Sequence, residues 1–198
     1  MTIPDSIPGF PPDGNEIDTM RGFLGCVMTC SQHRAAELLA GMSATDAGPG
    51  LHGVVLGLVV EVVAAGLAPD PRVLIAEAQR RGLLDTEDKH QQFALWLVDT
   101  YRTAPYPEAG QALRGAVLEA AYRRELRDHA ERLLRATDYA GVETLHVLAE
   151  LDDRLVELWR RLATDLHSRG LDTAPTGPRR LPPRAEPDLG TADARHAA

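Results

Sequence analysis

Apolar residues recur every three or four positions between residues 145 and 166. This spacing puts them on one side of an α-helix for about six turns, as along the seam of a coiled coil. Such a helix does not bury its apolar side by itself, so it must pack against another helix or another chain. The row consists of Leu145, Leu148, Leu151, Leu155, Trp159, Leu162 and Leu166.

A second long segment with helical spacing precedes this row, from about Pro107 to Ala136, and residues 138–141 break the chain between the two. Two helices joined by a short turn form an antiparallel hairpin. Val147, Val156 and Leu158 widen the apolar side beyond what a hairpin buries alone. The side therefore packs on the rest of the chain or on a partner, and we predict a homodimer. The predicted self-association residues are Leu145, Leu148, Leu151, Leu155, Trp159 and Leu162.

Five shorter helices are predicted upstream of the hairpin. The fourth is marked best, because Asp70 is a good N-cap, Pro71 suits the first helical position and Gly82 ends the apolar spacing. No segment has convincing strand spacing. The predicted fold class is all-α, a compact bundle of about five helices (16–106) followed by a long antiparallel helical hairpin (107–170). The five helices span about 18–28, 34–40, 52–65, 71–81 and 88–103.

The two ends of the chain differ in composition from the part between them. Residues 1–15 contain four prolines and two glycines, a composition that opposes regular structure. Prolines are also frequent after about residue 173. We therefore predict a disordered N-terminal arm over 1–15 and a Pro-rich disordered tail over 171–198, where Arg179, Arg180 and Arg184 form a small basic cluster.

The composition of the chain argues against several classes of protein function. A net charge of -8 disfavours direct nucleic-acid binding, which needs a basic face. The two cysteines, Cys26 and Cys30, provide no disulfide framework, so a reducing cytoplasm is expected. Neither a secretory signal nor a membrane span is visible, because the most apolar run, Val54–Ala65, is short and contains Glu61.

The sequence contains one lysine, Lys89, which lies between Asp88 and His90. A phosphate-binding loop of the type G-x-x-x-x-G-K-[S/T] needs a lysine beside the phosphates, so this chain has no such loop. A G-x-S-x-G signature for a nucleophilic serine is also missing. We expect no enzyme activity, no catalytic residue and no bound cofactor or metal.

Several stretches follow one another in a fixed order over residues 16–168. They are Glu16-Ile17, Phe23–Met28, His52 followed by Val54–Ala65, Ala65–Leu84, Phe93–Leu95, Thr103–Pro105 and Tyr122–Leu126. Together they resemble the N-terminal domain of DnaB-type replicative DNA helicases, and the most specific stretch is Ala65–Leu84, which is similar to that family's segment ending in "LrrrGeL". The chain departs from the family pattern at Ala47, at Gly53 and at residues 90–92, positions that bear on partner specificity.

The resemblance implies a non-catalytic module associated with DNA replication. In the family, hairpins pair into dimers that build a collar, and the collar is a docking surface for primase. The resemblance therefore implies a homodimer or higher homo-oligomer, with primase or a replicative helicase as partner. The ATPase domain of the family's full-length members is not expected in this chain, which looks like a free-standing module or a trimmed helicase. A regulator that caps a full-length helicase is an alternative.

Other motifs are compatible with different chemistry. Residues 48–53 satisfy G-x-G-x-x-G, but a helical stretch and a polar turn precede them, so a loop leading into a helix is favoured. Two E-x-x-H spacings, Glu87 to His90 and Glu143 to His146, leave open a helical metal-binding protein, with Glu119 or Glu150 as further ligands. The arginines of 123–135 alternate with acids, which favours a salt-bridged exposed helix.

Overall fold

The computed structural model describes residues 18–150 and 152–168, and within these ranges it contains helices and 3₁₀ turns but no strand. The prediction of an all-α fold is confirmed. The elements in chain order are α1 (Thr19–Thr29), α2 (Gln32–Leu39), η1 (Ala44–Ala47), α3 (Leu51–Ala64), α4 (Pro71–Arg80), α5 (Glu87–Arg102), η2 (Pro107–Ala109), α6 (Gly110–Ala136), α7 (Val142–Ala149) and α8 (Asp153–Ser168). The arm over 1–15 and the tail over 171–198 lie outside the described residues.

The helix starts in the body follow from side chains that accept hydrogen bonds from the first turn. The carboxylate of Asp70 accepts from the backbone N–H of Arg72 at 2.8 Å, and Pro71 occupies the first position of α4. Ser31 and Thr86 cap α2 and α5 in the same way. At the other end of α4, Gly82 has φ +66°, a conformation that other residues adopt at a cost.

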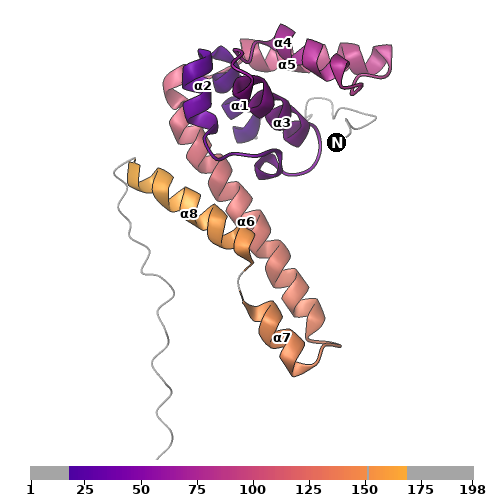
Figure 1. The fold of residues 1–198 in the computed structure, drawn as a ribbon, viewed down its shortest axis with the longest axis vertical. Coiled ribbons are helices and arrows are strands. Elements are labelled where there is room, and N and C mark those ends of the chain that lie inside the picture. The colour runs from indigo at the N-terminus through magenta and orange to yellow at the C-terminus, as the bar shows by residue number, and fades with distance from the viewer. Residues whose placement is uncertain (1–17, 151, 169–198) are drawn as a thin grey trace, which may run out of the picture.

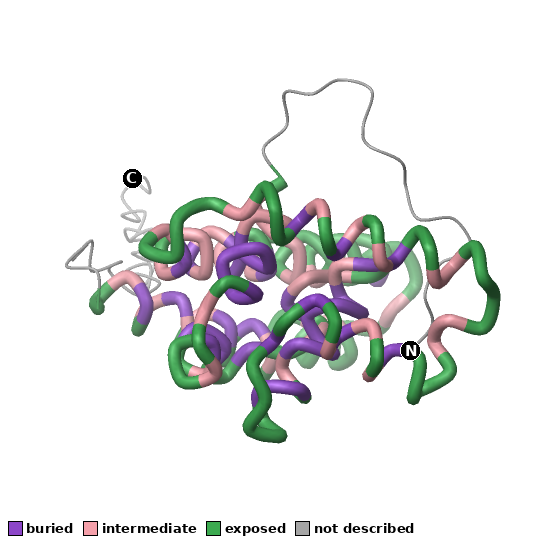
Figure 2. The backbone as a smooth tube through the Cα atoms, turned by 90° about the horizontal axis from the view of Figure 1, so that it is seen from above, coloured by how far each residue is buried: buried purple, intermediate pink, exposed green. Residues whose placement is uncertain are grey.

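The core of the body is built around α3. Ten of the 14 residues of α3 are buried, so this helix is covered on most of its circumference by α1, α2, α4 and η1. Phe23 of α1 and Phe93 of α5 are fully buried beside it in the same apolar cluster. Figure 2 shows the buried backbone concentrated where these helices meet, with exposed turns around it.

The helix α6 joins the body to the hairpin. Its first half packs against α1, α2 and η1, and the same helix continues beyond the body to meet α8 and then α7 (Figure 1). Figure 1 shows α4 and α5 at one end of the molecule and α7 at the other. The surfaces of these two ends are therefore well separated.

The second arm of the hairpin is divided into two helices where the sequence pattern predicts one continuous helix. Glu150 has extended backbone angles and ends α7. Asp152 begins α8, because its carboxylate accepts from the N–H of Arg154 at 2.9 Å and its carbonyl accepts from the N–H of Val156. Aspartate favours this capping position over a helix interior. The predicted interface residue Leu151 lies at this break, outside the described residues.

No helix in the described part of the chain combines the length and the hydrophobicity that crossing a bilayer requires.

Candidate self-association surface

The two arms of the hairpin pack through one row of α8. Leu155, Leu158 and Leu162 are buried, and they lie on the side of α8 that faces α6. Next to this row, the ring of Trp159 lies 5.6 Å from the ring of Tyr122 of α6. Two of the predicted interface residues, Leu155 and Leu162, therefore pack within a single chain.

Two buried ion pairs hold α8 against the body. The guanidinium of Arg161 donates to the carboxylate of Asp46 in η1 at 2.9 and 3.2 Å. On the α6 side, Arg114 and Gln111 donate to the carboxylate of Asp165 at 2.6 and 2.8 Å. Because one partner of each pair is almost fully buried, the orientation of α8 relative to the body is tightly specified.

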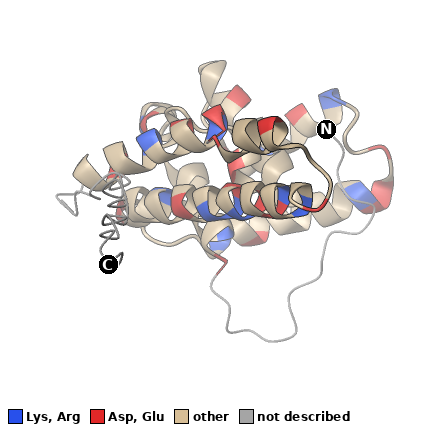
Figure 3. Cartoon of the chain, turned by 90° about the horizontal axis from the view of Figure 1, so that it is seen from below, with Lys and Arg blue, Asp and Glu red and all other residues tan. Residues whose placement is uncertain are grey.

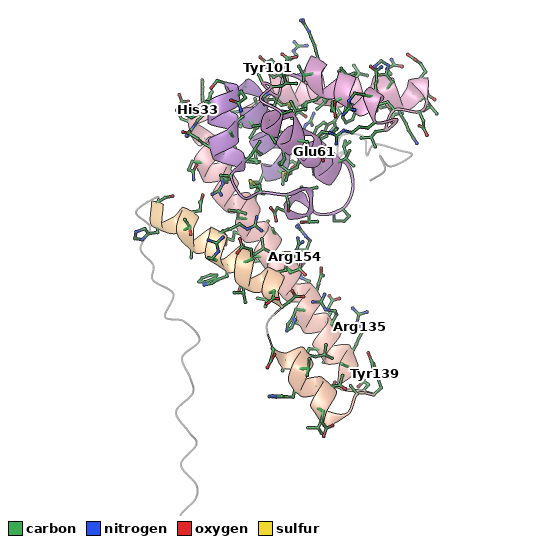
Figure 4. All side chains as sticks on the ribbon, viewed as in Figure 1. His33, Glu61, Tyr101, Arg135, Tyr139 and Arg154 are labelled. Atoms are coloured by element: carbon green, nitrogen blue, oxygen red, sulfur yellow. The ribbon has the colours of Figure 1, made fainter. Side chains whose placement is uncertain are left out.

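The outer part of the hairpin exposes large apolar side chains. Leu134 is 70% exposed, Val142 is 78% exposed and Tyr139, in the turn, is 81% exposed. The predicted interface residues Leu145 and Leu148 are half-buried on α7. Figure 4 shows Tyr139 at the far end of the hairpin, with Arg135 near it. An apolar surface of this kind on a soluble protein commonly marks an interaction site.

Helical periodicity places five apolar residues of the hairpin on one face. On α6, Leu126 and Leu134 are both rotated in the same sense about the helix axis, away from the half-buried row that includes Leu133. Val142 is rotated in that same sense from the packed row of α7, and Val156 and Trp159 are rotated in it from the packed row of α8. When two right-handed helices pack antiparallel, residues rotated in the same sense from the packed rows lie on the same face of the pair. We call Leu126, Leu134, Val142, Val156 and Trp159 the hairpin face.

Only Trp159 belongs both to the predicted interface and to the hairpin face. The sequence pattern locates the apolar row of the second arm but does not say which part of a wide row points inward. Leu134 and Tyr139 were not among the residues singled out from the sequence. The spacing of Leu126, Ala130 and Leu134, four residues apart, is the signal that identifies this flank of α6.

In the Gly-rich stretch 48–53, residues 48–50 form the turn after η1, and residues 51–53 begin α3. This stretch borders an open cavity of about 620 Å³ that is also lined by Arg124, Glu125, Asp128 and Arg154. Both arginines donate to the carbonyl oxygen of Thr45, and Arg154 also pairs with Glu125 at 2.7 Å. With two cations and two carboxylates on its wall, the cavity lacks the positive charge that a phosphate group requires. Figure 4 labels Arg154 at the beginning of α8.

The E-x-x-H pairs lie apart from each other. Glu87 and His90 are on α5, where His90 is within 3.2 Å of the amide nitrogen of Gln79, whereas Glu143 and His146 are exposed on α7. Nowhere in residues 18–150 and 152–168 do three or more histidine, cysteine or acidic side chains gather at metal-binding distance. The structure does not favour the metal-binding alternative.

The two cysteines lie on α1 and just after it. Burial, together with the nearby Cys30 and Glu108, raises the pKa of the Cys26 thiol to about 11. Burial also raises the pKa of Cys30. Thiols with raised pKa values are poor nucleophiles and poor metal ligands at neutral pH.

Three of the arginines between residues 123 and 135 pair with acids of the same chain, and two of these pairs have the helical spacing that the sequence predicts. Arg123 pairs with Glu119 at 2.6 Å and Arg135 pairs with Glu131 at 3.5 Å, both across one helical turn. Arg132 reaches Asp152 at 3.6 Å. Figure 3 shows basic and acidic residues interleaved along the helices instead of gathered into a single basic patch. Such a surface gives little attraction to a nucleic-acid backbone.

Comparisons with known proteins relate this architecture to a solved structure. No family model matches the chain. No curated protein matches it either. Among solved structures, the crystal structure of the N-terminal domain of DnaB helicase from Mycobacterium tuberculosis matches with a TM-score of 0.54 and 19% sequence identity. The match covers 77% of this chain and 97% of that one.

The chain has the fold of a DnaB helicase N-terminal domain. The resemblance found in the sequence is therefore confirmed at the level of fold. Because the match covers 77% of this chain, it extends beyond the predicted body, which spans residues 16–106.

Proposed function

We propose that the protein is a non-catalytic self-association and docking module related to DNA replication. The observation that carries this proposal is the exposed apolar hairpin face, at the end of a molecule whose fold is that of a replicative helicase's N-terminal domain. A surface that exposes Leu134, Val142 and Tyr139 to water is costly unless a partner covers it.

The proposed partner at the hairpin face is a second copy of the chain. Closed two-fold dimers are the commonest oligomers, and one apolar face that meets its own copy satisfies this symmetry. In this arrangement Trp159 forms the edge of the contact nearest the body, and Leu134 and Val142 form its outer part. Leu155 and Leu162 contribute indirectly, because they fix the position of α8 under Trp159. Leu145 and Leu148, which are half-buried in the packed row of α7, contribute in the same indirect way beside Val142.

The proposed role in replication is docking rather than catalysis. A dimer joined at the hairpin leaves the surfaces of α4 and α5, at the other end, free for a primase or a replicative helicase. The second candidate is a regulator that caps a full-length helicase by offering the same hairpin face to the helicase's own hairpin. Both roles use one surface, and they differ in whether the dimer or the mixed complex is the more stable.

The first experiment is the mass of the protein in solution, measured by light scattering behind a sizing column. We expect a dimer or a higher oligomer. Leu134→Asp combined with Val142→Asp places two charges in the hairpin face and should give a monomer with an unchanged circular dichroism spectrum. Val147→Asp is the matched control, since Val147 is 66% exposed on the opposite flank of α7. It should leave the mass unchanged.

Two results count against the proposal. A monomer at the highest accessible protein concentration would mean that the hairpin face has no partner among copies of this chain. A mass that stays dimeric in the Leu134→Asp, Val142→Asp variant would locate the contact elsewhere. To separate the two candidate roles, purified replicative helicase is mixed with the protein, and loss of the homodimer in favour of a mixed complex supports the regulator.

A further inference from the structure

The open cavity beside the Gly-rich turn lies where the hairpin joins the body. Its walls come from the turn after η1 and from the helices α3, α6 and α8. Its volume of about 620 Å³ is within the range of sites that hold small molecules. Four charged side chains line it: Arg124, Glu125 and Asp128 of α6, and Arg154 of α8 (Figure 4). The charges that are not matched within the chain decide which ligand this cavity can hold.

The walls of the cavity are held by close packing and by hydrogen bonds. A Cβ atom at Gly53 would collide with the carbonyl oxygen of Gly48, so the start of α3 touches the turn directly. The guanidinium of Arg154 donates to the hydroxyl and to the carbonyl oxygen of Thr45 at 3.0 and 3.3 Å. Because these contacts fix the walls, a ligand binds without first ordering a loop. The departure from the family pattern at Gly53 is part of this wall.

Two of the four charges neutralise each other. The Nε atom of Arg154 lies 2.7 Å from a carboxylate oxygen of Glu125, whose side chain is only 18% exposed. The other two, Arg124 and Asp128, are four positions apart on α6, a spacing at which opposite charges commonly pair. They do not pair with each other, because Arg124 turns towards η1 and donates to two of its carbonyl oxygens at 3.2 and 3.1 Å.

Arg124 and Asp128 therefore each present an unmatched charge to the cavity. Both hydrogen bonds of Arg124 use Nη2, and its Nε and Nη1 atoms have no acceptor in the described part of the chain. The exposed carboxylate of Asp128 makes no ion pair or hydrogen bond with any described residue. Ala44, Pro49 and Val54 line the same cavity. The wall thus offers a cation, an anion about 6 Å further along α6 and an apolar surface.

We propose that this cavity binds a free α-amino acid with an apolar side chain. The carboxylate of the ligand accepts from the guanidinium nitrogens of Arg124 that η1 leaves free, and its ammonium group donates to the carboxylate of Asp128. The apolar side chain of the ligand lies against Pro49 and Val54. Hydrogen bonds between charged groups at both ends are stronger than neutral ones. A phosphate ester or a simple amine satisfies only one of the two charges, so the wall discriminates against both.

This site goes beyond the proposed function and does not depend on it. Leu126 of the hairpin face is two positions from Arg124 and from Asp128, which places it about 200° around α6, on the opposite side of the helix. On α8, Val156 is likewise two positions from Arg154. A ligand in the cavity therefore leaves the hairpin face uncovered. Because it contacts both α6 and the turn after η1, it holds the hairpin more firmly on the body.

A titration with L-leucine at neutral pH, followed by nuclear magnetic resonance, tests the site. The backbone amide signals of Gly48, Gly50 and Gly53 report on the cavity, and we expect them to shift in a saturable way. N-acetyl-L-leucine lacks the ammonium charge and L-leucinamide lacks the carboxylate, so each should bind at least about tenfold more weakly than L-leucine. Absence of saturable shifts, or equal binding of all three compounds, would overturn the proposal.

Two substitutions assign the charges. Asp128→Asn should weaken L-leucine binding about tenfold and leave the affinity for N-acetyl-L-leucine unchanged, because that compound has no ammonium group. Arg124→Gln should weaken L-leucine binding to a similar extent and leave the affinity for L-leucinamide unchanged, and circular dichroism checks that it is folded. Arg123→Gln and Asp138→Asn are the matched controls, since both residues are exposed and neither lines the cavity. If Asp128→Asn binds L-leucine as tightly as the native chain does, the proposed site is wrong.

Discussion

Arg161 of α8 and Asp46 of η1 are 115 residues apart in the sequence, yet their side chains form two hydrogen bonds at 2.9 and 3.2 Å. Asp46 is almost fully buried, and its carboxylate also accepts from the backbone N–H of Ser43 at 2.8 Å. Arg161 donates in addition to the carbonyl oxygen of Gly41. This pair fixes the near end of the hairpin on the body, so the surface around Trp159 keeps one orientation.

Removing the carboxylate should destabilise the fold. Asp46→Ala leaves the guanidinium of Arg161 buried without its anion, and we expect the free energy of unfolding to fall by about 3 kcal/mol. Chemical denaturation followed by circular dichroism measures the change. Glu119→Gln is the control, because Glu119 pairs with Arg123 at the exposed surface of α6. Its effect should stay within about 0.5 kcal/mol. Equal effects would mean that the Arg161–Asp46 pair contributes no more than a surface pair.

The inward row of α8 should contribute to stability and not to self-association. Leu158 is fully buried, so Leu158→Ala should cost about 2 to 5 kcal/mol through lost burial and the cavity left behind. Val156→Ala, on the hairpin face, should change the stability of the monomer by less than about 0.5 kcal/mol. Light scattering on both variants completes the test. Weaker dimerisation by Leu158→Ala with unchanged monomer stability would contradict the assignment of this row to the core of one chain.

The buried thiol of Cys26 should be unreactive near neutral pH. Its pKa is raised to about 11, first by burial, so almost none of it is thiolate at pH 8. Alkylation with iodoacetamide, located by mass spectrometry, should modify Cys30 before Cys26. The folded-state pKa lies above the ordinary value of about 8.5, so the proton is held more tightly in the folded state. Its contribution to stability is therefore complete below about pH 8.5 and is lost as the pH rises towards 11.

Cys26→Ala removes this dependence. The unfolding free energy of the variant should fall less steeply between about pH 8.5 and 11 than that of the native chain. Denaturation midpoints across this range measure the difference. Parallel curves for the two proteins would show that the Cys26 thiol does not contribute to the alkaline loss of stability.

Much of the fold follows from patterns that can be read in the sequence. The start of α4 at Pro71 is predicted by its N-cap and proline, because these residues act locally through hydrogen bonds and a fixed φ angle. The break between α7 and α8 was not predicted. The apolar spacing continues across the break through Leu148, Leu151 and Leu155. The spacing pattern therefore does not detect the break, which depends on one capping residue, Asp152.

For a related reason, the sequence pattern does not separate the inward part of the apolar row from its outward part. Spacing identifies a wide apolar row, but Leu155 and Trp159 lie on neighbouring parts of that row and differ in burial only because of where α6 passes. The position of α6 is set by tertiary contacts such as Arg161 with Asp46, which have no local sequence signal.

Two glycines of α1 should respond in opposite directions to the same substitution. A Cβ atom at Gly25 lies 2.9 Å from the carbonyl oxygen of Thr100 and about 3.0 Å from the Cβ of Ala104, so Gly25→Ala forces α1 away from the end of α5. We expect a loss of about 1 to 3 kcal/mol in the free energy of unfolding. A Cβ at Gly22 meets only side-chain carbons of Leu113 and Pro105 at 3.7 Å, which is ordinary contact.

Gly22→Ala should therefore stabilise the protein by about 0.5 to 1 kcal/mol, because alanine loses less backbone entropy in a helix than glycine does. Denaturant midpoints of both variants, measured beside the native chain, give the two signs. A stabilising Gly25→Ala would mean that α1 and α5 are further apart than their backbone contact indicates.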